Sequence, residues 1–319
     1  MKRVFAVALL CCGVGAPPAV AQSALTLIKQ AALPYAQGYI NPLGNMLSAV
    51  FNSGQYHTAD VSSFHVYASV QLTGALIPSA DKVFSPDYII DTHGNTSLPV
   101  ELRDQTFHVH KTNVPTVLGG AADNMFLIDT TINGQLYQYG ELPPGIDANY
   151  VPLVVPHVEI GSYMNTELLL RGAPPLETNS SIGKISFYGI GLRHELSSYF
   201  PALLVHVSVM VMYQHLGAGS LLAVDALNGA VLASINLPMV TLYGGLQAER
   251  ARLHVHYEFQ QPDFEGETVD LTAQSTNNFR ATVGATVKLL LLYINGQITF
   301  APVSTVGLGI GLRIPPSIF

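Results

Sequence analysis

Residues 250–260 alternate between apolar and polar side chains at every position. The apolar positions are Ala251, Leu253, Val255, Tyr257 and Phe259, and the polar ones are Arg250, Arg252, His254, His256, Glu258 and Gln260. A side-chain period of two is that of a β-strand, so the segment predicts a strand with one apolar and one polar face. About eleven residues is also the length that a tilted strand needs to cross the hydrocarbon core of a bilayer.

The same alternation recurs along the chain, over Phe64–Leu76, Val158–Leu170, Leu203–His215, Ala281–Leu289, Leu290–Phe300 and Thr305–Ile314. Two segments alternate less regularly, the glycine-rich Ile182–Glu195 and Val231–Ala248, where the phase changes at Pro238. A phase change beside a proline is typical of a β-bulge. Because single-chain bacterial barrels have an even number of strands, these nine candidates predict about ten strands, within a range of eight to fourteen.

The missing strand is sought in Asp81–Val154, a stretch that is too long for a simple loop. This stretch contains a predicted hairpin over Phe126–Tyr139, around the turn dipeptide Asn133-Gly134.

The resulting fold class is all-β, a transmembrane antiparallel β-barrel with an N-terminal helical segment. An arginine or lysine that faces lipid costs about 2–4 kcal/mol at mid-membrane, so the polar face of residues 250–260 is expected to look inward. The alternative is a soluble periplasmic β-sandwich, a binding protein, whose sheets need only one apolar face each. The chain has no tryptophan, so tyrosine and phenylalanine would have to form any aromatic girdle.

The first residues have the pattern of a secretory signal. A basic start at Lys2-Arg3, an apolar run and the small-x-small site at Ala19–Ala21 predict that residues 1–21 are cleaved. Cys11 and Cys12 lie within the signal, so the mature chain is expected to have no disulfide and no thiolate site. We therefore expect export to the outer membrane of a Gram-negative bacterium, with outer-membrane lipid and the barrel-assembly machinery as partners.

Charge excludes one class of partner. The net charge of −7 becomes −9 without the two basic residues of the signal, leaving 12 basic residues against 21 acidic ones. An acidic chain with no basic run argues against nucleic-acid binding. Only 11% of residues are charged, against about 25% in ordinary soluble domains, which favours the membrane.

Leu25–Phe51 has helical periodicity that Pro34 and Pro42 interrupt, so two short helices are predicted. Residues 22–60 are expected to plug the barrel lumen or to form a lead-in that packs on the barrel's edge. We expect this part to emerge at the periplasmic end, where the first strand begins. The barrel itself is assigned to residues 61–319, with a long insertion at about 81–154.

Several stretches resemble an uncharacterised family of Gram-negative outer-membrane β-barrel proteins, domain of unknown function 6588. The matching stretches are Asn41–Gly44, Asn52–Ala59, Ile77–Phe84, Asn278–Gly284 and Gly309–Arg313. The sequence departs from the family at Gln55, where tryptophan is expected, and beyond Arg313. The resemblance implies a barrel in the outer membrane and no known activity. The glycines and prolines of these stretches are attributed to turns and strand packing.

Inward-facing polar residues define the candidate lumen. The predicted lumen-lining residues are His65, Gln71, Glu159, Glu167, His206, Arg250, Arg252, His254, His256, Glu258, Arg280, Lys288 and Arg313. They could line a narrow passage for a small solute or form a salt-bridged core that closes a structural barrel. The second reading is favoured for about ten strands, because small barrels fill their interiors with side chains.

The sequence contains weak indications of metal binding and of a hydrolase site. His254 and His256, with Glu258, and the pair His108 and His110 could bind a metal, but two imidazoles do not complete a site, so no metal and no cofactor is predicted. His206, Ser208 and Asn165 could belong to an outer-membrane lipid-modifying hydrolase. No Gly-x-Ser-x-Gly motif supports that alternative, and no catalytic residue is assigned.

Overall fold

The computed structural model describes residues 33–61, 63–94, 98–177, 184–200, 204–258 and 268–314. The predicted signal, residues 1–21, and the first part of the predicted helical segment, Leu25–Ala32, lie outside the described residues. Among the residues that are described, no helix is both long and apolar enough to span a membrane.

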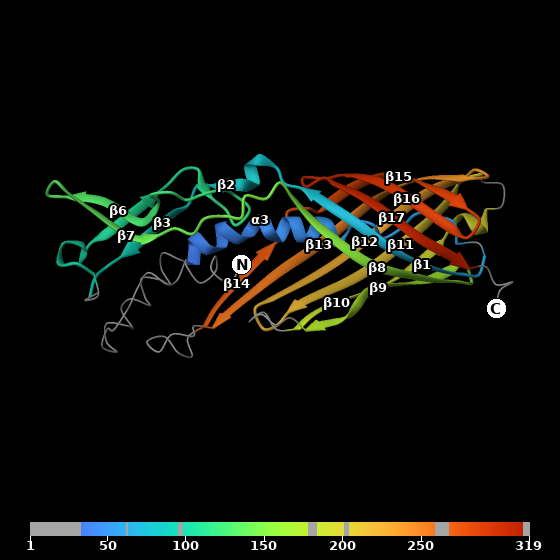
Figure 1. Cartoon of the computed structure of the whole chain (residues 1–319), viewed down its shortest axis with the longest axis horizontal. Coiled ribbons are helices and arrows are strands. Elements are labelled where there is room, and N and C mark those ends of the chain that lie inside the picture. The colour runs from blue at the N-terminus through green and yellow to red at the C-terminus, as the bar shows by residue number, and fades with distance from the viewer. Residues whose placement is uncertain are drawn as a thin grey trace. The chain divides into compact units, whose positions relative to one another are not determined.

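Ten antiparallel strands form a closed ring (Figure 1). The ring consists of β1 (His65–Leu76), β8 (Tyr150–Tyr163), β9 (Thr166–Glu177), β10 (Lys184–Glu195), β11 (His206–Ala218), β12 (Leu222–Asn236), β13 (Val240–Glu258), β15 (Phe279–Leu289), β16 (Leu292–Phe300) and β17 (Thr305–Ile314). Pairing of β1 with both β8 and β17, and of β12 with β13, closes it. The predicted barrel of about ten strands is confirmed, and the β-sandwich alternative is wrong.

The predicted strand Val158–Leu170 is a hairpin of two strands. Met164 and Asn165, with φ of 48° and 58°, form a turn between β8 and β9. A register shift between Ile160 and Tyr163 keeps even-numbered residues facing outward on both strands. The sequence alternation therefore continues through the turn, which is why the segment resembled one strand.

A second predicted strand is also a hairpin. Val231–Ala248 is not a bulged strand but the hairpin of β12 and β13, and Pro238 lies in its turn. The amide of Leu237 donates to the carbonyl of Val240 at 2.8 Å across that turn. The missing barrel strands were thus hidden in hairpins, and not in the insertion that was searched for them.

The chain divides into two compact units. One comprises Gly44–Leu76, Tyr150–Leu253 and Gln274–Phe319, and holds the barrel ring. The other comprises the chain up to Leu43, Ile77–Asn149 and His254–Ala273.

The second unit contains three small antiparallel pairs. They are β2 (Val83–Phe84) with β5 (Val114–Pro115), β3 (Asp87–Asp91) with β4 (Thr106–His110), and β6 (Phe126–Ile132) with β7 (Gln135–Glu141). The short helices η2 (Ser79–Lys82) and η3 (Val100–Leu102) also belong to it, and β14 (Thr268–Gln274) pairs with β13. The hairpin predicted around Asn133-Gly134 is confirmed as β6 and β7, with positive φ at both turn residues.

The two ends of the barrel differ. At the end that we call the turn end, β8–β9, β12–β13 and β15–β16 are joined by short turns, and β10–β11 by residues 196–205, which include η4 (Ser197–Tyr199). Strand β1 begins and β17 finishes there. At the opposite end, the loop end, β11–β12 and β16–β17 are also joined by short turns, but residues 77–149, the longest connection between ring strands, join β1 to β8 there. Bacterial outer-membrane barrels have short turns on the periplasmic side and longer loops outside.

The described part of the predicted helical region is one continuous helix, α3 (Leu33–Phe51), so the break predicted at Pro42 is wrong. Pro42 lies inside the helix and does not end it. A proline in a helix interior costs about 3 kcal/mol, and burial of large side chains on both sides of Pro42 offsets this cost. Those side chains include Ile40, Met46 and Phe51, each at most 1% exposed.

The outer surface of the ring is apolar. Large apolar side chains alternate outward on every ring strand, among them Val70, Leu72, Val154, Leu170, Ile190, Leu192, Val211, Val231, Leu242, Val283, Ile294, Ile298, Leu308 and Ile310. The register places Val70 beside Ile310 and Val283 beside Ile298, so they form a continuous belt. In the ring strands with described burial, outward-facing lysine, arginine, aspartate and glutamate side chains lie toward the loop end, at Glu177, Lys184, Asp225, Arg250 and Arg252.

The stretch that first indicated a barrel points the opposite way from the prediction. Arg250, Arg252, His254 and His256 are exposed, whereas Ala251, Leu253 and Val255 are buried. These arginines continue the outward-facing row of Leu242, because β13 keeps one phase throughout. The pairing of β13 with β15 ends at Ala248, so this part of β13 extends past the apolar belt, where charge need not face lipid.

Candidate functional site

The barrel lumen is occupied by the protein's own chain. We call residues 44–61 the lumen segment; it comprises the last part of α3 and the extended residues that follow. Every residue from Ala49 to Ala59 is buried. The segment is held by side chains that project inward from the ring, and about half of these contacts are with its backbone. A buried carbonyl needs such a partner, because leaving it unpaired costs about 1–3 kcal/mol.

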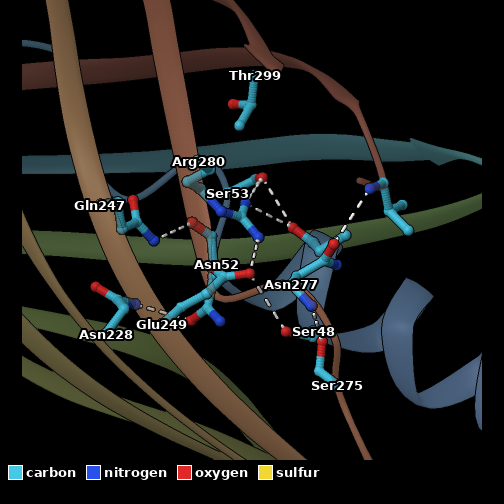
Figure 2. Close-up of polar contacts among 12 residues, drawn as sticks. Ser48, Asn52, Ser53, Asn228, Gln247, Glu249, Ser275, Asn277, Arg280 and Thr299 are labelled. Atoms are coloured by element: carbon cyan, nitrogen blue, oxygen red, sulfur yellow. Dashed lines mark hydrogen bonds and ion pairs between the residues drawn. The ribbon is translucent and has the colours of Figure 1, made fainter. Parts of the chain in front are cut away.

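Arg280, near the start of β15, holds the segment at the loop end. Its guanidinium donates to the carbonyl of Ala49 at 3.1 Å and to the Ser53 hydroxyl at 2.7 Å. It also pairs with Glu249 on β13 at 2.6 Å. Figure 2 shows this group together with Ser48, whose hydroxyl donates to Glu249 at 3.5 Å. A cation beside the last carbonyls of a helix also interacts favourably with the helix dipole.

The end of α3 is satisfied by the wall. Arg171 on β9 and Gln214 on β11 both donate to the carbonyl of Phe51, at 2.7 and 2.8 Å. The Gln55 side chain donates to the same oxygen at 3.3 Å. The last four helix carbonyls, which have no partner within a helix, are thus all paired, since those of Ser48 and Val50 accept from Asn52 and Ser53.

Beyond the helix, the wall continues to hold the main chain of the segment. Gln247 donates to the carbonyl of Asn52 at 3.0 Å, and Asn228 to the Asn52 side chain at 2.8 Å (Figure 2). Ser53 shares a hydroxyl hydrogen bond of 2.8 Å with Thr305, the first residue of β17. Gly54 has a φ of 65°, which turns the chain in a conformation that side chains disfavour.

A fully buried ionic cluster surrounds the segment nearer the turn end. Arg193 on β10 pairs with Glu159 on β8 at 2.9 Å and with Glu167 on β9. Its other terminal nitrogen donates to the carbonyl of Thr58 at 2.8 Å. His57 of the segment lies 3.3 Å from the Glu159 carboxylate. Water cannot reach these buried carboxylates through the apolar wall. The Arg193 guanidinium, which lies between them, compensates their negative charge.

The segment ends among polar groups at the turn end. The amide of Ala59 donates to the Ser234 hydroxyl at 2.9 Å, and Asn236 donates to Asp60 at 2.6 Å. The amide of Val61 donates to the carboxylate of Glu195 at 2.6 Å. Glu195 is the last residue of β10, and Asn236 is the last residue of β12.

Glycines make room for this filling. The inward positions of β17 include Gly307, Gly309 and Gly311. A Cβ at Gly311 would lie 2.5 Å from the Cβ of Ser69 and 2.6 Å from the ring of Tyr67. Tyr67 in turn packs on the His57 ring, with centroids 4.1 Å apart. These glycines therefore act through packing, as their family stretch was expected to do.

The predicted lumen residues divide into three groups. His65, Gln71, Glu159, Glu167 and Arg280 are buried on the inner face, and His206, Lys288 and Arg313 are inward and half-buried. Arg250, Arg252, His254 and His256 are wrongly assigned, because they lie on the exposed face. The Glu258 side chain lies outside the described part of the structure.

Sequence reasoning missed four residues that donate to the segment's backbone, Arg171, Arg193, Gln214 and Gln247, and also Asn228, which donates to the Asn52 side chain. Each is a polar side chain at an inward position of a ring strand. The available signal was a charged or amide residue at a polar position of an alternating segment. The hairpin at Met164 and the mixed phase of Ile182–Glu195 obscured it.

The structure does not assemble the histidine pairs considered as metal sites into a metal-binding geometry. His254 and His256 contact Thr272 and Asp270 and belong to no cluster of three candidate ligands among the described residues. His108 and His110 are exposed on β4. Two clusters of ligand type do occur, Asp60 with Glu195 and His206, and His65 with Glu159 and Glu167. In the second, Arg193 already supplies the cation.

The hydrolase constellation is not assembled. The hydroxyl of Ser208 has no hydrogen-bond partner among the described residues, and His206 instead contacts Glu195 at 2.8 Å. Ser197 donates to that same carboxylate oxygen at 2.7 Å, so both groups use one acceptor. Asn165 lies in the turn between β8 and β9, and the structure gives it no role beside His206.

Fold and lumen together define a closed β-barrel filled by its own preceding segment. The model of the family of unknown function DUF6588 matches residues 1–314, so the chain belongs to that family. The sequence has no match among curated proteins.

Among solved structures, the chain is similar to the attachment invasion locus protein Ail of Yersinia pestis, in complex with the heparin analogue sucrose octasulfate. That likeness has 10% identity and a TM-score of 0.27, over 79% of this chain and 99% of that one. The chain is also similar to the translocator domain of autotransporter NalP from Neisseria meningitidis, with 8% identity and a TM-score of 0.32, over 92% and 95%. A third likeness, to OccK11 of Pseudomonas aeruginosa, has 7% identity and a TM-score of 0.22, over 82% and 99%.

Proposed function

We propose that this protein is an outer-membrane β-barrel that is sealed by its own lumen segment, and that it acts as a structural barrel rather than an open passage for solutes. The observation that carries the proposal is the buried contact between three wall arginines and the segment's carbonyls, Arg280 to Ala49, Arg171 to Phe51 and Arg193 to Thr58.

The outer surface supports the membrane location. The outward belt contains no lysine, arginine, aspartate or glutamate between its rims, which suits a lipid contact. Exposed aromatic rings lie at both ends of the ring, with Tyr150, Tyr188, Phe279 and Phe300 toward the loop end and Tyr163 toward the turn end. Such rings favour the interface between lipid and water, and here they take the place of tryptophan.

The nature of the filling supports a sealed lumen. A water-filled passage would leave wall arginines hydrated, but Arg171, Arg193 and Arg280 are each at most 4% exposed. Their partners belong to the lumen segment or to the facing wall, so a solute would have to break charge-assisted hydrogen bonds to pass. Hydrogen bonds to charged groups contribute about 1.5–3 kcal/mol each.

Conductance in planar lipid bilayers tests the seal. Full-length protein should insert and conduct little, whereas a variant lacking residues 25–61 should insert and conduct clearly more. A variant lacking residues 25–43 is the matched control, because it keeps the lumen segment and should stay closed. Correct folding of each barrel is checked by its heat-modifiable mobility in gels. A folded variant lacking 25–61 that conducts no more than the full-length protein would refute the proposal.

A crosslink keeps the test decisive if the emptied barrel does not fold. The Ser53 and Thr305 hydroxyls are 2.8 Å apart, and both signal cysteines are expected to be absent from the mature chain. The double variant Ser53→Cys/Thr305→Cys should therefore form a disulfide in the inserted protein, seen as a mobility difference on reduction. Failure to form this bond in a folded barrel would mean that the segment does not occupy the lumen.

A further inference from the structure

The direction of the lumen segment is opposite to the one its sequence position suggests. Near its start, Asn45 accepts from the backbone amide of Thr276 at 2.9 Å, and Ser53 meets Thr305. Thr276 precedes β15 and Thr305 begins β17, so these contacts lie at the loop end. The prediction that this part of the chain emerges where the first strand begins is therefore wrong.

Successive residues then contact successively deeper parts of the wall. The carbonyl of His57 accepts from Thr286, close to the end of β15. Thr58 shares a 3.3 Å hydroxyl bond with Ser234, close to the end of β12. Val61 reaches Glu195 at the turn end, and β1 then begins at His65 and runs back toward the loop end. The chain thus passes through the whole barrel before its first strand.

The chemistry of the wall suits an extended polypeptide. Arginine, glutamine and threonine side chains of the wall donate to backbone carbonyls at Ala49, Phe51, Asn52, His57 and Thr58. Carbonyl oxygens are common to all residues, so these five carbonyl contacts do not depend on the sequence of the segment. The lumen is therefore built as a binding site for a main chain rather than for a small solute.

We propose that the chain upstream of Gly44 has been threaded through the barrel's own lumen and is displayed on the outer surface of the cell. This inference rests on the proposed outer-membrane location, because the loop end is the outer end of such barrels. The lumen segment begins at Gly44 at that end, and the described residues before Gly44 belong to the same compact unit as residues 77–149, which connect β1 to β8.

Two crosslinks test the direction of threading without reference to the membrane. The pair Ser53→Cys/Thr305→Cys joins the segment to the loop end, and Thr58→Cys/Ser234→Cys joins it to the turn end. Both disulfides should form in the purified barrel. The mismatched pair Ser53→Cys/Ser234→Cys should not form, and its formation in place of the matched pairs would overturn the threading.

Cysteine labelling of whole cells tests the display. Single-cysteine variants would be made at Asn41, upstream of the segment, at Leu136 in the β6–β7 hairpin, and at Leu290 in the β15–β16 turn. Their native side chains are exposed, the last two by 58% and 97%. With a membrane-impermeant maleimide, positions 41 and 136 should label equally in intact and permeabilised cells. Position 290 should label only after permeabilisation.

The outcomes separate the two proposals. Labelling at 136 but not at 41 in intact cells would overturn surface display and leave the outer-membrane barrel standing. Labelling at 290 in intact cells, with 41 and 136 protected, would reverse the orientation and also overturn display. If none of the three positions labels before permeabilisation, the outer-membrane location itself fails.

Discussion

Replacing Arg193 with methionine should destabilise the barrel more than any single change at its surface. The guanidinium is completely buried, pairs with Glu159 at 2.9 Å, contacts Glu167, and donates to the carbonyl of Thr58 at 2.8 Å. Methionine keeps much of the side-chain volume and removes the charge. Two buried carboxylates would then face each other without the cation that separates them.

The expected magnitude follows from these contacts. Removing one partner of a buried ion pair costs about 3–5 kcal/mol, because the remaining charge is left uncompensated. The lost bond to Thr58 would cost about 1.5–3 kcal/mol by itself. Since one side chain makes all these contacts, the two losses do not add, and we expect about 3–5 kcal/mol for the whole change.

The assay is urea unfolding of the barrel in phospholipid vesicles, followed by far-ultraviolet circular dichroism and by gel mobility. Tyrosine fluorescence is a third probe, because the chain has no tryptophan. Lys184→Met, on the same strand but exposed, is the matched control and should change the free energy of unfolding by less than about 0.5 kcal/mol.

A rescue variant separates charge from packing. Adding Glu159→Gln and Glu167→Gln to Arg193→Met removes both uncompensated carboxylates and should recover most of the lost stability. If Arg193→Met shifts the free energy of unfolding by less than about 1 kcal/mol, charge compensation does not hold this cluster together. A triple variant no more stable than the single one would refute the same reasoning.

Two further changes follow from packing and burial. Gly311→Ala should cost about 1–3 kcal/mol by overpacking against Tyr67 and Ser69, whereas Gly74→Ala, whose Cβ would meet nothing within 4 Å, should cost much less; equal urea midpoints would contradict this. Burial raises the pKa of Tyr39 to about 12 and that of Tyr88 to about 12. The folded state therefore favours the neutral phenols, and their contribution to stability is fully present below about pH 10 and lost as the pH rises through about 12. Phenolate absorbance should show that Tyr39→Phe loses a component titrating near pH 12, and loss of a component near pH 10 would refute it.

The sequence determined the class of fold because successive side chains of a barrel strand face the outside and the lumen in turn. The strand therefore shows an alternation of apolar and polar residues. Alternation over Phe64–Leu76 and Thr305–Ile314 gave strands within one residue of those in the structure, β1 and β17. Nine candidate strands and the need for an even strand number then set the count near ten. The Asn133-Gly134 turn was also readable, because two positive φ angles demand such residues.

Alternation does not record where a strand turns back or which face is inward. A bulge kept the phase of β8 and β9 the same across their turn, so two strands looked like one. Residues 250–260 carried a strand pattern, but over the described positions 250–256 the apolar face is the buried one, and this part of β13 extends beyond its pairing with β15. Tertiary context alone decides whether a polar face meets lumen or outside water.

The occupied lumen was decided by the tertiary structure. From sequence, the segment around Phe51 could plug the lumen or pack at an edge, because a helical stripe does not specify its partner. Only the closed ring brings Arg171 and Arg193, from the neighbouring strands β9 and β10, and Arg280, from the distant β15, onto carbonyls of one segment. Any residue can accept a hydrogen bond through its main-chain oxygen, so the residue types of the segment do not predict these contacts. The path of the chain through its own barrel can therefore be determined only from the tertiary structure.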